Sequence, residues 1–443
     1  MNPFAPKLNA RRLRRQDGMA LVLVLLVIAV LSLLGVAGTR SAQTELQMGQ
    51  KDLIGRQALS VAEAGINHAY SLVSADATLS YPPSALGFAG ELSNGGTGGA
   101  LASLGTTATL SGKSYRFRSF GGGTADGYYV QAVDNYDETS GANDPATDRD
   151  GKIYLVSRGH VGSAERIVTA LVAGNPIFPN AVFGNRSVKV GGGALVDGFD
   201  SRNGAYSAAT AGSTSVRSDG DVNVGGTNTL VKGDATASGT VSVGGGATVT
   251  GAQNPGAPTA SFPPVPVCGP PYSPSTDISG TNYTYDPSTG VLTTDSHNTG
   301  SVTLLGGTYC FQSITLQSHA TLQISSPVNI YLTGLLEASS GTFVNTTAVA
   351  NNLKLFSSFV STYKSNGDPS NNQAITLSGG QQSYMAVYAP QAAVTFSGNS
   401  DFYGSVIADY VADTGGTPIH YDGALGTVLG AGAGLSNWHE VRN

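Results

Sequence analysis

The feature that most constrains this chain is a run of twenty uncharged, mostly apolar residues, 19–38, that follows a basic segment. A helix of this length, at about 1.5 Å per residue, spans roughly 30 Å, which is the hydrocarbon thickness of a bilayer. The small residues at the far end of the run form no clear signal-peptidase site, so we expect the helix to stay on the protein. The positive-inside rule predicts a cytoplasmic N-terminus from Arg11, Arg12, Arg14 and Arg15.

The same helix is predicted to continue to about residue 74, because no proline interrupts residues 19–74. Beyond the apolar run, apolar residues recur at spacings of three and four, the pattern of an amphipathic helix. They are Leu46, Leu53, Ile54, Ala58, Val61, Ala62, Ile66, Ala69 and Tyr70. The stripe fits a helix that packs only on its own domain, and it equally fits a helix that also packs against neighbouring helices.

The boundary between the basic segment and the apolar run resembles the leader of a type IV prepilin. The matching residues are Arg14-Arg15-Gln16-Asp17-Gly18 and then Met19-Ala20-Leu21-Val22-Leu23. Further along, the chain is similar to the N-terminal region of PilX-type minor pilins at Leu34-Gly35-Val36-Ala37, Thr39-Arg40-Ser41, Arg56-Gln57-Ala58 and Ala62-Glu63-Ala64-Gly65. The resemblance covers roughly the first 70 residues of the chain.

This resemblance implies that a prepilin peptidase cuts between Gly18 and Met19, that the new terminus at Met19 is methylated, and that the helix packs against other pilins. It also implies a single-pass protein of the inner membrane that later moves into a pilus at the cell surface. Most pilins have a glutamate at the fifth mature position, where this chain has Leu23. The departure favours a minor pilin at the fibre tip over a bulk subunit.

Two β-rich regions are predicted after the leader (1–18) and the helix (19–74), which makes the expected fold class α+β. Residues 75–181 contain alternating segments and are expected to form a small antiparallel sheet. Residues 182–443 contain many short strands between Gly and Asn turns, which indicates a large solenoid of parallel β-coils, with a β-sandwich as the alternative. Eight prolines in 254–274 predict an insertion there rather than a coil.

The last hundred residues carry a second resemblance. The segments are Tyr384-Met385-Ala386-Val387-Tyr388-Ala389-Pro390, the stretch from Ser397 to Ala408, and Ile419-His420-Tyr421-Asp422. They are similar to an uncharacterised C-terminal domain that is often joined to PilX-like N-termini, and to the β-helical solenoids of adhesins and bactofilins. This resemblance implies the architecture and no activity.

Cysteine usage and charge limit the redox state and the partners. Cys268 and Cys310 lie in the exported part of the chain, where an oxidising compartment favours a disulfide, and two buried thiols are the alternative. The leader carries five basic residues and one acidic residue, so the mature chain keeps 18 Lys+Arg and 28 Asp+Glu, a net charge of −10. That sign disfavours nucleic acid as a partner.

One acidic segment is a candidate calcium loop. Hard cations need several oxygen ligands on a flexible loop, and residues 134–151 are the densest acidic stretch. The segment lacks the twelve-residue spacing of a calcium loop and its closing glutamate, so a solvated acidic turn is the alternative. The candidate ligands of a structural calcium ion are Asp134, Asp137, Asp144, Asp148 and Asp150.

Catalysis is not favoured by any cluster in the sequence. His420 and Asp422, beside Asp401 and Asp409, are more typical of residues that cap coils than of an acid–base set. The carboxylates Asp197, Asp200, Asp219 and Asp221 resemble the acidic clefts of β-helical polysaccharide enzymes, but only Arg202 and Arg217 accompany them. The sequence has no nucleophile elbow, phosphate loop or zinc spacing.

The sequence therefore predicts a non-enzymatic minor pilin or pseudopilin subunit without a certain cofactor. The solenoid would be displayed at the fibre tip, where it could bind a surface glycan or a tip adhesin. Two alternatives remain open at this point: a membrane-anchored periplasmic enzyme that acts on polysaccharide, and an envelope scaffold that never leaves the membrane.

Overall fold

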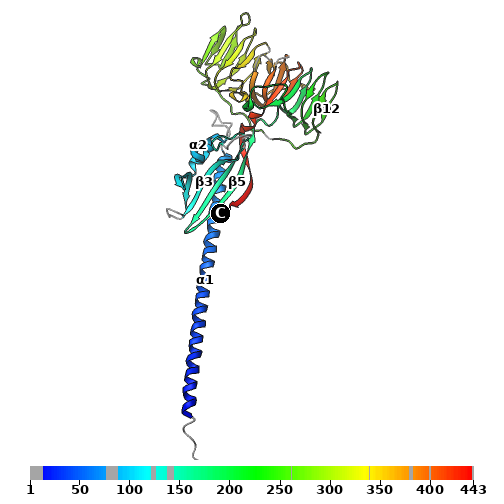
Figure 1. Ribbon diagram of the computed structural model, residues 1–443. Coiled ribbons are helices and arrows are strands. Elements are labelled where there is room, and N and C mark those ends of the chain that lie inside the picture. Colours follow the sequence, from blue (N-terminus) through cyan, green and yellow to red (C-terminus); the bar gives the residue numbers. More distant parts are fainter. Residues whose placement is uncertain are drawn as a thin grey trace, which may run out of the picture.

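The computed structural model describes residues 13–75, 88–120, 126–136, 144–260, 262–338, 340–378, 383–398 and 401–441. A long helix leads to a small sheet, and a much larger β domain lies beyond the sheet, at the end opposite to the free part of the helix (Figure 1). The predicted α+β class is confirmed.

Helix α1 (Leu13–Ala75) contains 63 residues and is therefore about 95 Å long. Its second half packs on the small sheet through small side chains, since Ala58, Ala62 and Ala69 are fully buried. The approach is close: a Cβ added at Gly159 of the facing strand would lie 2.0 Å from the carbonyl oxygen of Ala58. Small residues on both partners therefore let the helix lie directly on the sheet.

The small sheet has six antiparallel strands in the order β1-β2-β3-β4-β5-β30. Their bounds are β1 Thr106–Leu110, β2 Lys113–Ser119, β3 Gly127–Asp134, β4 Lys152–Val161, β5 Ala164–Pro176 and β30 Leu429–Val441. Short helices α2 (Ala89–Gly96) and η1 (Gly99–Ser103) lie between α1 and β1 in the chain and contribute Leu92 and Leu101 to the core. The core under α1 is closed by apolar residues of β3, β4 and β5.

Strand β30 corrects the predicted range of the solenoid. All of residues 182–443 were expected to belong to the solenoid, but β30 pairs antiparallel with β5 and belongs to the small sheet. Its Gly430-Ala431-Gly432-Ala433-Gly434 stretch has neither β-branched residues nor alternation, so local pattern gives no reason to expect a strand there. Its place is set by pairing with residues more than 250 positions away.

The large domain is a solenoid of stacked coils, and each full coil contributes three short strands, as β8-β9-β10 and β11-β12-β13 do. Its strands are mostly parallel, so the β-sandwich alternative is wrong. Valine, isoleucine and leucine from the three sides point inward and form one continuous core. The three sides are named below the strap face, the open face and the histidine face.

The strands divide among the faces as follows. The strap face contains β19 Gly307–Phe311, β22 Val328–Leu332, β25 Leu353–Ser357, β8 Val216–Ser218, β11 Ala235–Ala237 and β14 Gln253–Asn254. The open face contains β17 Val291–Thr294, β20 Ser313–Thr315, β23 Leu336–Ala338, β26 Ala374–Ser378, β9 Asp221–Val224 and β12 Val241–Val243. The histidine face contains β18 Ser301–Leu304, β21 Thr321–Ile324, β24 Thr342–Asn345, β29 Ile419–Asp422, β7 Leu195–Phe199, β10 Leu230–Val231 and β13 Thr248–Val249.

Three long strands bend across more than one face at the middle of the stack: β6 Val182–Val190, β27 Ser383–Ser397 and β28 Phe402–Asp413. One end of the stack carries antiparallel strands, since β15 Ile278–Thr281 pairs with β18 and β16 Tyr283–Asp286 pairs with β17. These strands cap that end, because they do not continue the parallel ladder.

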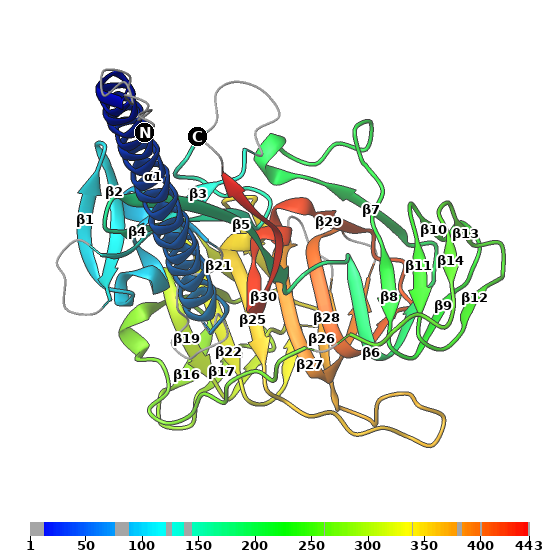
Figure 2. The same ribbon diagram turned by 90° about the horizontal axis from the view of Figure 1, so that it is seen from below.

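The coils do not stack in the order of the chain. Strands β6 to β14 run outward from the middle of the solenoid, and the chain then crosses to the capped end and returns coil by coil through β15 to β29. The two halves meet where β28 pairs with β6 and β29 pairs with β7. Figure 2 shows this order, with β16 and β17 at one end, β12 and β13 at the other, and β28 beside β6 in the middle.

Candidate functional site: the free helix and the faces of the solenoid

The free half of α1 has no partner within the described chain. The side chains of Leu21, Leu23 and Leu33 are between 62% and 71% exposed. Among the described residues, α1 is the one helix that is long and apolar enough to cross a membrane. An apolar surface of this extent is unfavourable in water, so it needs lipid or other protein around it.

The strap face is covered by the described residues of the proline-rich segment 255–274, which we call the strap. The strap forms no coil, in agreement with its prolines, and it crosses the strands of this face. Arg217 at one end donates to the carbonyl oxygen of Pro258 (2.6 Å), and Tyr388 in the middle donates to that of Pro263 (2.6 Å). The strap therefore bridges both halves of the solenoid.

Under the strap lies a ladder of outward-facing apolar side chains, one from each successive coil. Its members are Cys310, Tyr331, Phe356, Tyr388, Ile407 and Phe183. This ladder was not predicted from the sequence. The signal was present, because strands such as β22 and β25 have apolar residues at consecutive positions, which indicates burial on both sides.

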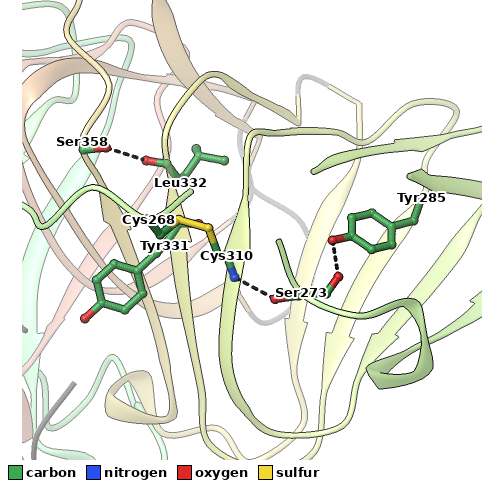
Figure 3. The surroundings of a disulfide bond; sticks show 7 residues. All are labelled: Cys268, Ser273, Tyr285, Cys310, Tyr331, Leu332 and Ser358. Carbon is green, nitrogen blue, oxygen red and sulfur yellow. Dashed lines mark hydrogen bonds between the residues drawn. A yellow bond between two sulfur atoms is a disulfide. The ribbon is translucent and has the colours of Figure 1, made fainter. Parts of the chain in front are cut away.

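A disulfide joins the strap to this ladder at Cys268 and Cys310. The sulfur atoms are 2.13 Å apart and the Cα atoms 5.9 Å apart. Both residues are buried, and next to the bridge Ser273 accepts a hydrogen bond from the backbone N–H of Cys310 (2.8 Å) and Tyr285 donates to the Ser273 carbonyl (2.6 Å) (Figure 3). The bridge therefore lies where the strap reaches the capped end.

The predicted calcium ligands lie around the start of β4. Asp148 is turned toward the backbone, because its Oδ1 accepts from the N–H groups of Asp150 (3.2 Å) and Gly151 (2.7 Å). Burial raises the pKa of Asp148 to about 6, although these hydrogen bonds oppose the change. Asp150 forms an ion pair with Lys152 (2.7 Å). Asp148 Oδ1 and Asp150 Oδ2 thus already have partners within the protein.

The other calcium candidates are more dispersed. Asp134 is buried and accepts from the N–H of Tyr136 (3.1 Å), and Asp144 accepts from the Thr147 hydroxyl (2.8 Å). Asp137 lies outside the described residues. Within the described ranges, no three His, Cys, Asp or Glu side chains are grouped as a metal site requires. A structural calcium ion stays a prediction.

The histidine face brings together two residues that the sequence analysis had considered in different sets. His420 of β29 lies beside Asp197 of β7, with Nδ1 2.6 Å from Oδ1, and both are buried. Asp197 also accepts from Lys232 and from the Tyr206 hydroxyl, each at 3.1 Å. Burial pulls the pKa of Asp197 upward, but the hydrogen bonds outweigh it and the pKa lies below its usual value.

Rings close this cluster against solvent. The Tyr206 ring is 3.8 Å from the His420 ring and the Tyr403 ring is 4.9 Å from it, measured between centroids. Asp401 is the remaining acidic neighbour, 3.8 Å from His420 Nε2. His420 is only 2% exposed, so a polymeric substrate has no access to its imidazole ring. The geometry is that of a buried polar contact between coils.

The other carboxylates of the considered sets serve local structure. Asp200 pairs with Arg202 (2.7 Å), and Asp409 pairs with Arg186 (3.2 Å). The remaining three accept backbone N–H groups from other segments, 19 to 221 positions away in the chain: Asp219 from Ala260, Asp221 from Thr240 and Asp422 from Ser201. These carboxylates are bound by arginines or by backbone N–H groups of neighbouring segments, and they do not converge on one cleft.

The open face carries a groove that the sequence analysis did not identify. Its floor is formed by outward-facing side chains of β20, β23 and β26, of which Glu337 is the central one. One wall comes from turns of the coils and the other from the segment before β26. The lining residues are Gln312, Ser313, Thr315, Gly334, Leu335, Glu337, Phe359, Asn372, Ala374 and Thr376.

Comparison with known proteins identifies two parts of the chain. The chain has a membrane-length apolar helix with an antiparallel sheet packed on its second half. Residues 17–67 match the PilX N-terminal family, so the resemblance to PilX-type minor pilins is confirmed. Residues 320–428 match a domain of unknown function, DUF7305, and this match ends one residue before β30 begins.

One similar solved structure is the competence-associated pilin ComZ from Thermus thermophilus. It is 11% identical over 87% of this chain and 97% of that chain, with a TM-score of 0.27. A superposition of that quality carries no argument about this chain. No curated protein matches it.

Proposed function

We propose that this protein is a minor subunit of a type IV pilus or related pseudopilus, and that it carries its solenoid at the fibre tip. The observation that supports the role most directly is the free half of α1, which is apolar and exposed, while the second half holds the small sheet. Such a rod can exchange lipid contacts for contacts with the helices of other pilins without any change in the domain.

The start of the chain supports the processing step. The PilX N-terminal match begins at residue 17, directly before the Gly18–Met19 bond. Cleavage there by a prepilin peptidase would remove the basic leader and leave Met19 as the mature terminus. The arginines before the cut favour a cytoplasmic N-terminus in the inner membrane before assembly.

Two features support the tip position. Leu23 supplies no carboxylate at the position where bulk pilins have one, and it projects into the surroundings at 62% exposure. The solenoid also extends well beyond the width of the small sheet (Figure 1). Side-by-side repetition of such a body along a thin fibre would be hindered sterically, whereas a tip leaves it free to meet a surface or a tip adhesin.

The polysaccharide-enzyme alternative finds less support. In the described part of the chain, its candidate carboxylates are engaged in caps and ion pairs, and His420 is covered by tyrosine rings. A PilX-type N-terminus is also typical of a structural protein. The scaffold alternative differs from the pilin proposal in one respect only, which is whether the protein leaves the membrane.

The test is the mature N-terminus of the protein in a sheared pilus fraction, read by mass spectrometry. We expect Met19, in methylated form. Gly18→Val should retain the leader and be missing from the sheared fraction. Gly244→Val is the matched control, because Gly244 is exposed on the solenoid, away from α1, and a Cβ there meets nothing within 4 Å. A terminus beyond Gly38, or a protein found only in membranes when pili are present, would refute the proposal.

A further inference from the structure

The groove on the open face is a hollow in the outer surface of the solenoid, and it lies on a different face from the strap and from the His420 cluster. The strap face is closed by residues 255–274, and the histidine face is closed at its middle by Tyr206 and its neighbours. The floor of the groove consists of Thr315, Glu337 and Thr376, which are direct register partners on three successive coils. Their backbones are therefore spaced by about 4.8 Å along the solenoid axis.

The polar groups of the groove define its chemistry. Among the described residues that line the groove, these groups are hydroxyls and amides with a single carboxylate, and there is no lysine, arginine or histidine. Glu337 is exposed, and within the described ranges its carboxylate takes part in no hydrogen bond or ion pair. An ionised carboxylate is an acceptor for two donors at once, which suits a pair of neighbouring hydroxyl groups.

The same lining excludes other ligand classes. A polyanion would face Glu337 without any cationic partner, so its charge would be disfavoured. A divalent cation would find one carboxylate where it needs several oxygen ligands. The apolar side chains of Leu335 and Phe359 in the walls fit the C–H surface of a ring. A neutral, hydroxyl-rich chain of rings satisfies all of these groups.

One wall of the groove is held rigidly. The segment between β25 and β26, which contributes Phe359 and Asn372, is fixed to the middle of the solenoid by Asp368, whose Oδ1 binds Lys189 (2.7 Å) and the Tyr410 hydroxyl (2.9 Å). Close by, the Arg186 guanidinium lies 4.1 Å from the centroid of the Tyr363 ring. Because this wall is already fixed before binding, the protein loses less conformational entropy when a ligand binds.

We propose that this groove binds a neutral, unbranched oligosaccharide that lies across the coils, with Glu337 at its centre and the two threonines beside it. The biological use of the site rests on the proposed function, because only an outward-displayed solenoid meets glycans outside the cell. The binding itself does not depend on assembly.

The experiment uses the full-length chain in a zwitterionic detergent without sugar groups, titrated calorimetrically with hexasaccharides of glucose and of N-acetylglucosamine. Oligogalacturonate serves as the anionic comparison and calcium as the cationic one. We expect at least one neutral hexasaccharide to bind and oligogalacturonate not to bind. Glu337→Gln should weaken binding about tenfold or more, since a hydrogen bond to a charged group is lost.

Thr376→Val should weaken binding severalfold, and its matched control is Thr342→Val, another half-buried strand threonine that lies on the histidine face. Equal binding by Glu337→Gln, Thr376→Val and the unchanged chain would overturn the proposal, as would absence of binding or a preference for the anion or for calcium at Glu337. Glu337→Gln should still reach the sheared pilus fraction, so failure of glycan binding with normal assembly refutes this inference alone.

Discussion

The disulfide gives the sharpest quantitative prediction. Cys268 and Cys310 are 42 positions apart, and the loop that they close contains β15 to β18, the strands that form and adjoin the capped end of the solenoid. In the chain-entropy model, closing a loop of this size removes about 13 cal/mol/K from the unfolded chain, which corresponds to about 4 kcal/mol at 25 °C. Removing the bridge should therefore destabilise the capped end first.

The variant is Cys268→Ala with Cys310→Ala. Alanine is preferable to serine because both sites are buried, and a buried hydroxyl without a partner would add a cost of its own. Hydrogen exchange measured by mass spectrometry is the assay. We expect amides in β15 to β18 to exchange up to about a thousandfold faster, which is the factor that corresponds to about 4 kcal/mol. The exchange rates of amides in β28 and β6 should change little, because these strands pair with each other away from the bridge.

Two controls separate the covalent bond from the substitution. Reduction of the unchanged chain should reproduce the pattern, and the same reductant should leave the double-alanine variant unaffected. Unchanged exchange at the capped end, or an equal acceleration through the entire solenoid, would show that the bridge does not act through this loop.

Three further predictions concern individual side chains. Burial raises the pKa of Asp413 to about 6, so the folded state binds its proton more tightly than the unfolded state does, and this residue lowers stability as pH rises from about 4 to 6. The free energy of unfolding of Asp413→Asn should therefore exceed that of the unchanged chain by up to about 3 kcal/mol at pH 7 and by almost nothing at pH 4, as measured by denaturant unfolding. Tyr388→Phe removes the hydrogen bond to the Pro263 carbonyl and should lower the free energy of unfolding by about 1 kcal/mol. Proteases should also cut the strap of this variant faster than the strap of the unchanged chain. The calcium hypothesis requires millimolar Ca²⁺ to raise the melting temperature and Asp148→Asn to abolish the effect, and an unchanged melting temperature would refute it.

Local signals in the sequence were sufficient to predict the helix and the solenoid architecture. The leader, the apolar run and the three-to-four spacing lie in continuous sequence, and they predicted α1 to within one residue at its C-terminal end. The short Val-rich strands likewise indicated a solenoid, because each strand and its glycine turn are local features. Inward-facing residues such as Val188 and Val222 are register partners, as stacked coils require.

The repeat of the solenoid was hidden by an insertion. The pattern Val-x-Val-Gly-Gly begins at Val188, Val222 and Val241, so the spacing is 34 residues and then 19. The difference of 15 residues corresponds to the segment after β7 that contains Tyr206 and covers His420. An irregular spacing obscured a regular stack.

The sites were harder to predict because they depend on which coils become neighbours. His420 and Asp197 are 223 positions apart and meet only because the chain returns to the middle of the solenoid. The floor of the groove is similar: a threonine, a glutamate and a threonine from three strands have no shared signature in sequence. The disulfide was easier to predict, since the chain contains only two cysteines.

The pairing of Pro176 with Leu429 has a consequence for how the small sheet and the solenoid depend on each other. The chain leaves the small sheet at the end of β5 and returns to it at the start of β30, and the backbone N–H of Ile177 bonds to the carbonyl of Val428 (2.8 Å). The solenoid is thus an insertion between two paired strands of the small sheet. Because the two strands are paired where the solenoid begins and ends, a tight turn could join them, and we expect α1 and the small sheet to keep their fold without the solenoid.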